Sequence, residues 1–178
     1  KLKGCALIDF GAGVTSVTVY KDGSLAGLYV IPLGSHLITR YLMSLGMPEK
    51  EAERVKRTYG NAIWEKDNEQ QMVTVDLADG QHSSEIKLSD INMVVEVRSR
   101  EIIENIYARM EDAGVAKDPG YSIVIAGNGA ALKNMREALS ERFKMDVRYA
   151  SVRKDLIADG EMIANNPRSE ERRVGKEC

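Results

Sequence analysis

The sequence predicts an α/β domain interrupted by a smaller α+β insertion. Three β-rich segments fill residues 1–34, and strand-like and helix-like segments alternate over residues 97–167. Between them, residues 35–96 contain two helix-like segments and one hairpin-like segment. We therefore expect one main unit built from 1–34 and 97–167, with 35–96 inserted into it.

Three strands are expected at the start of the chain. Cys5–Phe10 is a short apolar run closed by glycine, and Val14–Tyr20 is rich in β-branched residues. An Asp-Gly pair at 22–23 favours a tight hairpin turn, after which a third apolar segment extends to about Pro32. Together these segments predict a three-stranded antiparallel meander.

The inserted segment begins where the apolar spacing changes to a helical one. A first helix is expected up to Gly46, which is a suitable C-terminal stop. Pro48 begins a second helix that ends near Gly60, with acids early and bases late, as the helix dipole favours. Residues 70–77 and 83–88 flank a turn and predict a hairpin.

A long helix is expected to follow the hairpin, with Ser89 as its N-cap and Ala113 near its end. After it, residues 121–127 predict a buried strand, 130–143 a helix and 145–150 a last strand. The apolar stripe of the long helix contains one arginine and consists of Ile91, Val95, Arg98, Ile102, Ile106 and Met110.

The two ends of the chain are unlike the rest. Residues 168–178 are dense in charge and have no apolar period, so we expect a solvated tail that is disordered or non-native. The chain begins with Lys1 rather than methionine, and a strand is expected within a few residues. We therefore expect this chain to be a piece of a longer protein.

Composition and charge exclude several classes of function. The chain of 178 residues carries 25 Lys and Arg against 27 Asp and Glu, a net charge of −2, so no nucleic-acid partner is expected. No apolar run approaches the length of a membrane span. The two cysteines lie at opposite ends and, with two histidines, form no metal-binding spacing, so a reducing cytosol is the default expectation.

Asp9 ends the first predicted strand, and the turn after it contains Gly11 and Gly13. Mg²⁺ prefers hard oxygen ligands and usually takes one or two carboxylates plus phosphate oxygens. Glycines let a phosphate approach the main chain, and the backbone amides of such a turn can form an anion-binding nest. The Thr15 hydroxyl could add a further contact with the phosphate. A tight turn with a surface aspartate explains the same motif, and the sequence alone leaves both interpretations open.

A second glycine turn, Gly127–Gly129, connects a buried strand to a helix-like segment, as in many nucleotide-binding loops. It lacks the Gly-Lys-Ser/Thr of a Walker A loop, and Leu132 replaces the third glycine of a dinucleotide fingerprint. A protein-kinase interpretation of the Asp-Phe-Gly triplet is excluded, because no His-Arg-Asp precedes it and no Ala-Pro-Glu follows it. A plain tight corner would explain the second turn on its own.

The third feature is the pair Glu53 and Lys56 on the second predicted helix. An acid and a base three residues apart on a helix usually form a solvated surface pair that contributes little to stability. Taken alone, this pair therefore predicts an ordinary helix surface.

Together, the three features resemble the actin/Hsp70 ATPase superfamily, whose fold is ribonuclease H-like. The Asp-Phe-Gly-x-Gly turn between two strands resembles its phosphate-2 motif. Within the superfamily the chain resembles the FtsA family of bacterial cell-division proteins. The segments "VIPLGSHLITRYL", "EAERVKRTYGNA", "VVEVRSREIIENIYARM" and "IVIAGNGAALKNM" are similar to segments of that family in the same order. The similarity runs from about Gly4 to Pro167.

The resemblance implies a role for each feature. Asp9 would help to position Mg²⁺ through water, and Arg98 would take part in binding the carboxy-terminal peptide of the tubulin homologue FtsZ. Asn128 stands where the family has glycine, and because asparagine tolerates left-handed backbone we expect the turn to persist. The implied phosphate contacts are Gly11, Ala12, Gly13, Val14 and Thr15, and the implied adenosine contacts are Glu53, Lys56, Gly127, Asn128 and Gly129.

The resemblance also implies a function, that of the second lobe of an actin-like protein, with subdomain 2A from 1–34 and 97–167 and subdomain 2B from 35–96. Such a protein binds ATP and Mg²⁺, polymerises, and tethers FtsZ filaments to the inner face of the bacterial membrane at the division site. The first lobe and the membrane-binding helix are expected outside this chain, so this part alone should bind ATP weakly and hydrolyse little.

Two alternatives stay open within the same superfamily. One is a phosphotransferase of the sugar-kinase or acetate-kinase type, and the other is an actin-like ATPase of rod-shape or pilus assembly. The predicted insertion of two helices and a hairpin, followed by a long helix that bears Arg98, favours FtsA over a phosphotransferase.

Overall fold

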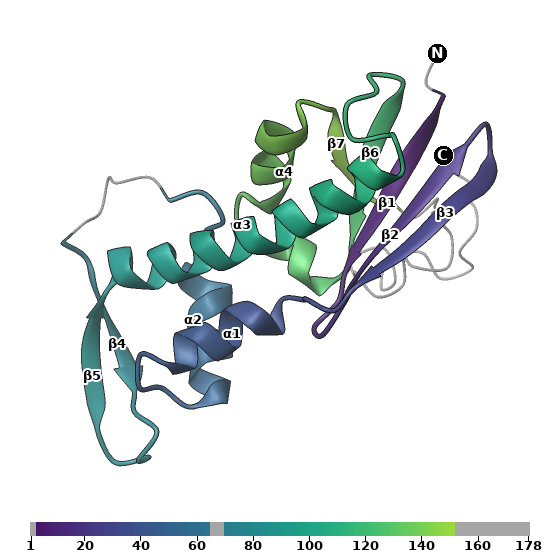
Figure 1. Cartoon of the computed structure of the whole chain (residues 1–178). Coiled ribbons are helices and arrows are strands. Elements are labelled where there is room, and N and C mark those ends of the chain that lie inside the picture. The colour runs from purple at the N-terminus through teal and green to yellow at the C-terminus, as the bar shows by residue number, and fades with distance from the viewer. Residues whose placement is uncertain (1–2, 65–69, 152–178) are drawn as a thin grey trace, which may run out of the picture.

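The computed structural model describes residues 3–64 and 70–151. The order of its strands and α-helices is the one that the sequence predicts (Figure 1): β1 (Gly4–Phe10), β2 (Thr15–Lys21), β3 (Ser24–Ile31), α1 (His36–Met43), α2 (Glu49–Tyr59), β4 (Met72–Asp76), β5 (Ser83–Lys87), α3 (Leu88–Asp112), β6 (Tyr121–Ala126), the 3₁₀ turn η2 (Asn128–Ala131), α4 (Met135–Phe143) and β7 (Val147–Tyr149).

Five strands form one mixed sheet in the order β3-β2-β1-β6-β7. The predicted meander is confirmed, because β1 pairs antiparallel with β2, and β2 pairs antiparallel with β3. On its other side β1 pairs in parallel with β6, which in turn pairs in parallel with β7. Strand β1 is therefore central, and its end at Asp9 lies between Ser16 and Ala126.

The burial of each strand follows from its residue pattern. All six residues of β6 are buried, and its near-continuous apolar run is typical of a parallel strand covered on both faces. In β2 buried and half-buried residues alternate, which is the period of a strand with one face on a core. The edge strand β3 is mostly exposed, and only Ile31 at its end is buried.

The two larger of three hydrophobic clusters in the described residues are joined by helix α3, and the third is a small group of Cys5, Val124, Ala126 and Ala150. The sheet core lies between the five-stranded sheet and helices α3 and α4, and the insertion core joins α1, α2, the β4–β5 hairpin and the first half of α3. On α3, Val95 belongs to the insertion core and Ile102 to the sheet core. Figure 1 shows this helix as a long bar from the sheet to the hairpin. The division into subdomains 2A and 2B stays a prediction.

Two helix starts differ from the sequence prediction. The long helix begins at Leu88, with Lys87 rather than Ser89 at the N-cap position, because the Leu88 amide already donates to the Gln71 carbonyl of the hairpin segment (2.8 Å). The hairpin therefore leads directly into the helix, and Ser89 lies within its first turn.

The helix expected from residue 130 begins only at Met135. The backbone of Lys133 is held in an isolated bridge with Asn61, and Asn134 adopts a left-handed conformation with φ 60°. A residue with positive φ interrupts a right-handed helix. Residues 128–131 therefore form a 3₁₀ turn, Leu132 and Lys133 form a short link, and the left-handed Asn134 precedes the helix.

The predicted charged tail, 168–178, lies outside the described residues. Within the ranges that the structure describes, no helix combines the length and the apolar run needed to cross a bilayer.

Candidate functional site

The two glycine turns lie at the same edge of the sheet. Strands β1 and β6 are parallel neighbours, and Asp9 stands in register with Ala126. The turns that follow these strands therefore leave the sheet side by side, at carboxyl ends where ligand sites of α/β folds commonly form. A side chain at Gly127 would collide with the Asp9 carboxylate and the Phe10 carbonyl, so the second turn packs directly against the end of β1.

Gly127 is the residue of the second turn that takes the left-handed conformation, with φ 82°. Asn128, which we expected to tolerate that conformation, is not among the described residues with positive φ. Gly129 does not have a positive φ, but it is close-packed, because a Cβ there would lie 2.8 Å from Phe10 Cβ. Both glycines therefore leave room for the end of β1.

The first turn is open to solvent on its outer side. Ala12, Gly13 and Val14 are exposed, and a Cβ at Gly13 would meet nothing within 4 Å. The inner side is anchored to the start of α1, where the Ser35 amide donates to the Gly11 carbonyl (3.0 Å) and the His36 amide to the Ala12 carbonyl (2.9 Å). The turn thus combines a fixed base with an accessible backbone.

Thr15 does not present its hydroxyl to this open side. Its side chain is buried, and its Oγ1 donates to the Leu33 carbonyl (2.8 Å). The hydroxyl therefore ties β2 to the segment that leads into α1. The Thr15 backbone therefore remains at the turn, but its hydroxyl, which the sequence suggested as a phosphate contact, is hydrogen-bonded to Leu33 instead.

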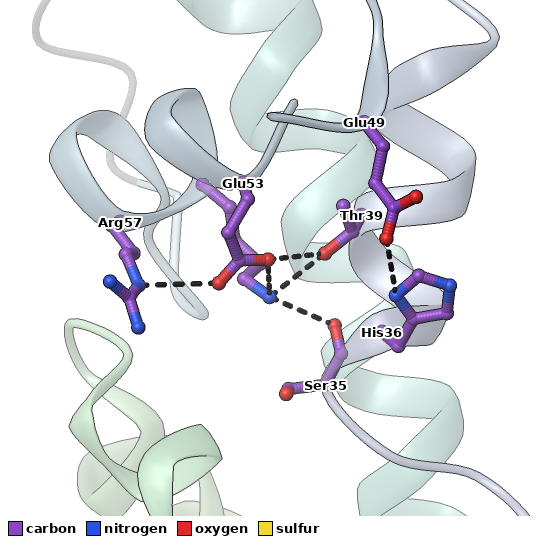
Figure 2. Close-up of polar contacts among 7 residues, drawn as sticks. Ser35, His36, Thr39, Glu49, Glu53 and Arg57 are labelled. Carbon is purple, nitrogen blue, oxygen red and sulfur yellow. Dashed lines mark hydrogen bonds and ion pairs between the residues drawn. The ribbon is translucent and has the colours of Figure 1, made fainter. Parts of the chain in front are cut away.

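Lys56 on α2 is buried rather than solvated, with a residue exposure of 7%. Its Nζ lies 2.7 Å from Glu53 Oε2 and donates to Thr39 Oγ1 (2.9 Å) and to the Ser35 carbonyl (3.2 Å). Thr39 Oγ1 in turn donates to Glu53 Oε2 (2.8 Å), which closes a small polar ring between α1 and α2 (Figure 2). The pair is thus part of an interhelical network, which the spacing alone did not distinguish from a surface pair.

Glu53 also reaches toward solvent through its second oxygen. Figure 2 shows its carboxylate between Thr39 and Arg57, and Oε1 lies 3.2 Å from Arg57 Nε. Burial alone raises the pKa of the Glu53 carboxyl, but the hydrogen bonds from Lys56 and Thr39 and the charges of Lys56 and Arg57 outweigh it. The pKa of Glu53 is therefore below its ordinary value, and the group stays ionised at neutral pH.

One pocket joins the α1–α2 network to the second glycine turn. It has a volume of about 310 Å³ and brings Glu53 and Lys56 together with Asn128 and Gly129, as predicted for residues that are far apart in sequence. Gly127, which was also expected at the adenosine, does not line it, and neither do Asp9, Arg98 or residues 11–15, although Phe10 does. Its walls mix charged and apolar side chains: Phe10, Ser35, Ile38, Glu53, Lys56, Arg57, Ile102, Asn128, Gly129, Ala131, Leu132 and Met135.

Sequence reasoning missed three polar residues of this site, Ser35, Thr39 and Arg57. Arg57 follows Glu53 by four positions, so the helical spacing of the two already contained a signal. Ser35 and Thr39 are also four positions apart, but their role depends on how α1 packs against α2, which no local pattern gives. The apolar floor and charged rim suit a ligand with a flat apolar ring and hydroxyl groups.

Across residues 3–64 and 70–151, no group of three or more His, Cys, Asp or Glu side chains is placed to hold a metal ion. His36 faces Glu49 on the rim of the α1–α2 contact (Nδ1 to Oε1, 3.8 Å; Figure 2). A single carboxylate such as Asp9 fits the way in which Mg²⁺ is held when phosphate oxygens and water complete its shell.

Arg98 lies on α3 at the contact with α1 and is not among the residues that line the pocket. Its guanidinium stacks over the Tyr41 ring at 4.1 Å from the ring centre, and Nη1 is 2.6 Å from Glu101 Oε2. The side chain is 24% exposed. Arg98 is therefore held in an intrachain ion pair with Glu101, and its guanidinium stays partly accessible.

Comparison of the sequence with known families identifies a match to "Cell division protein FtsA" over residues 6–168. FtsA of Porphyromonas gingivalis is 33% identical over 155 residues, which cover 86% of this chain and 32% of that protein. FtsA of Bacillus subtilis is 30% identical over 149 residues, covering 83% of this chain and 34% of that protein. The chain thus spans about a third of the length of these relatives.

Solved structures share the fold at lower identity. MreB5 of Spiroplasma citri bound to AMPPNP has a TM-score of 0.65 at 20% identity, over 83% of this chain and 48% of that one. A PilM–PilN type IV pilus biogenesis complex has a TM-score of 0.62 at 15% identity, over 88% of this chain and 40% of that one. These likenesses show an actin-like fold, and with the family match over residues 6–168 the chain belongs to the FtsA family of cell-division proteins.

Proposed function

We propose that this chain is the second lobe of a longer FtsA-family protein and carries one side of an ATP site. The observation that supports this most is the pocket in which Glu53 and Lys56 of the inserted segment meet Asn128 and Gly129. It lies at the edge of the sheet where Asp9 and the open glycine turn also stand. The MreB5 structure with the same fold is described as bound to AMPPNP, an ATP analogue, which agrees with this proposal.

Each group has a role that its surroundings suit. The apolar floor from Ile38, Ile102 and Met135 would accept an adenine ring, and the charged rim would accept ribose hydroxyls. The backbone of residues 11–15, which is exposed over Ala12, Gly13 and Val14, would face the phosphates, as nest-like turns do. Asp9 would hold Mg²⁺ through water, so that the ion neutralises phosphate charge. ATP hydrolysis would need groups from another lobe.

In the cell, we infer that the full protein polymerises and tethers FtsZ filaments to the inner face of the membrane at the division site. Membership of the FtsA family supports this inference. Arg98 is the residue of this chain that we assign to the FtsZ tail peptide, because a stacked guanidinium can still offer further donors to a carboxylate.

The alternatives within the superfamily are less well supported. The match over residues 6–168 is to FtsA, whereas the rod-shape and pilus proteins share only the fold, at 20% identity or less. The same family match does not favour a phosphotransferase.

The nucleotide proposal is tested by Asp9→Asn in the full-length protein. We expect the affinity for Mg-ATP to fall about tenfold, the usual loss for a group that acts on a metal through water, while the melting temperature stays nearly constant. Titration calorimetry with and without Mg²⁺ measures it, and Asp112→Asn, an exposed acid at the far end of α3, is the control. Equal Mg-ATP affinity in wild type and Asp9→Asn would reject the role of Asp9.

The partner proposal is tested by Arg98→Glu. Binding of the FtsZ tail peptide should weaken by at least about tenfold, as at a hot-spot arginine. Arg109→Glu reverses an exposed charge on the same helix and should bind the peptide like wild type. Equal peptide affinity in Arg98→Glu and wild type would place the tether site elsewhere.

A further inference from the structure

The pocket borders the base of the open glycine turn. Phe10, which directly precedes Gly11, lines it, and so does Ser35, whose amide donates to the Gly11 carbonyl (3.0 Å). A ligand that fills the pocket therefore has the open turn beside it. In the proposed function, the adenosine ends and the phosphates begin at this border.

Asn128 stands at the same border, between two glycines that pack against Phe10. A Cβ at Gly127 would lie 2.5 Å from the Phe10 carbonyl oxygen, and a Cβ at Gly129 would lie 2.8 Å from Phe10 Cβ. Asn128 itself is exposed and lines the pocket. The second turn therefore holds the backbone of residue 128 close to the end of β1, while Asn128 stays accessible to a ligand.

The side chain of Asn128 has hydrogen-bonding groups to offer a ligand. A carboxamide carries two N–H donors and one carbonyl acceptor. Over residues 3–64 and 70–151, none of the hydrogen bonds or ion pairs that the structure contains involves this side chain. The rim of the pocket thus carries a neutral donor that the fold itself does not use.

We propose that the Asn128 carboxamide donates a hydrogen bond to the phosphate chain of the nucleotide, where that chain leaves the pocket. A phosphate oxygen is a charged acceptor, and hydrogen bonds to charged groups are stronger than those between neutral groups. The open turn after β1 offers main-chain donors, and Asn128 adds a side-chain donor from the second turn. This inference rests on the proposed function, since it requires a nucleotide in this pocket, and it gives the second turn a phosphate contact as well as an adenosine contact.

The first test is Asn128→Asp in the full-length protein. The carboxylate has nearly the shape of the carboxamide, but it has no donor and repels phosphate. Titration calorimetry should show Mg-ADP binding weakened by at least about tenfold and adenosine binding by less than about twofold, because adenosine carries no charge. Asn105→Asp places the same charge on an exposed part of α3 and should bind both ligands like wild type. Equal losses for Mg-ADP and adenosine in Asn128→Asp would overturn the proposal.

Asn128→Ala distinguishes a contact from an obstruction. Residue 128 has no positive φ, so alanine fits its backbone, and an unchanged melting temperature checks that the variant is folded. If the carboxamide donates to phosphate, Mg-ADP binding should weaken by about tenfold, less than in Asn128→Asp, and adenosine binding should stay nearly constant. Tighter Mg-ADP binding in the alanine variant would mean that the side chain hinders the phosphates, which contradicts the proposal.

The contact can also be observed directly by NMR of the full-length protein with isotope-labelled asparagine. The side-chain NH₂ signal of Asn128, identified by its loss in Asn128→Ala, should shift more with Mg-ADP than with adenosine. Equal shifts with the two ligands would count against a phosphate contact. If wild type binds neither ligand, the proposed function fails and this inference fails with it. If wild type binds both and Asn128→Asp changes neither affinity, this inference alone fails.

Discussion

The turn after β1 is exposed over Ala12, Gly13 and Val14, whereas the turn after β6 is packed against Phe10. Both turns leave neighbouring parallel strands at one edge of the sheet. In the packed turn, glycine is needed because any side chain would meet the end of β1. In the open turn, Gly13 has space around it and an ordinary φ, so the fold does not need glycine there. At Gly11, by contrast, a Cβ would lie 2.7 Å from the Val14 carbonyl oxygen, so Gly13 is the glycine of the open turn whose free space suits the proposed ligand.

The largest effect that tests this contrast is expected from Gly127→Ala. The new methyl group would collide with the Phe10 backbone. The alanine would also have to keep a φ of 82°, which is unfavourable for every residue except glycine. We expect the free energy of unfolding to fall by about 3 kcal/mol, measured by urea denaturation. A loss below about 0.5 kcal/mol would show that the packed turn can relax.

A smaller loss is expected from Gly129→Ala in the same turn. Here φ is ordinary, and the new methyl group would lie 2.8 Å from Phe10 Cβ, 3.2 Å from the Phe10 carbonyl oxygen and 3.3 Å from Ser35 Cβ. These contacts are less close than those at Gly127 and add no strain from a positive φ, so we expect a loss of about 1–2 kcal/mol. Urea denaturation of both variants shows which one loses more unfolding free energy. A larger loss in Gly129→Ala than in Gly127→Ala would contradict the argument from backbone strain.

Acid should weaken the network that Glu53 forms with Lys56 and Thr39 between α1 and α2. The pKa of Glu53 is lowered from its ordinary value of 4.5, so its stabilising contribution is present above about pH 4.5 and is lost as the pH falls through the lower folded-state value. Glu53→Gln should therefore be less stable than wild type at neutral pH, by less than about 1 kcal/mol because the side chain is partly solvated, and the difference should shrink in acid. Denaturation curves of both proteins from pH 3 to 7 measure this difference in the free energy of unfolding. A difference that grows as the pH falls would contradict the prediction.

The smallest effect on stability is expected from Gly13→Ala. A methyl group there has open space, so the free energy of unfolding should change by less than about 0.5 kcal/mol. In the full-length protein the same variant should weaken Mg-ATP binding more than adenosine binding, since it narrows the backbone approach. A stability loss comparable to that of Gly127→Ala would remove the distinction between the two turns.

The element order could be predicted because local patterns determine it. The apolar run of β6, the β-branched residues of β2 and the helical spacing of α1 all have the expected period, and their order is confirmed. Helix starts were less predictable, because tertiary hydrogen bonds decide them. Leu88 is held by Gln71, and Lys133 by Ala62 (2.9 Å), and neither contact appears in a local pattern.

The site could be predicted only where residues carry a local motif. Gly127 and Asp9 stand at strand ends, and the sequence identified both. Glu53 and Lys56 look like any surface pair, so only the resemblance to a family indicated them. Thr15 was assigned to the phosphates because a hydroxyl after a glycine turn suits that role, but its hydroxyl donates to Leu33 across the fold.

Strand β1 pairs in parallel with a strand made much later in synthesis. Lys3 and Asp118, which form an ion pair at the start of β1 and β6, are 115 positions apart. A ribosome that adds about 5 to 20 residues per second needs roughly 6 to 23 s for that stretch. During this time the inserted segment, which has its own core, can fold, while the edge of β1 that will pair with β6 stays open. An unpaired apolar strand edge can join another chain, so aggregation of nascent protein is most expected before β6 emerges.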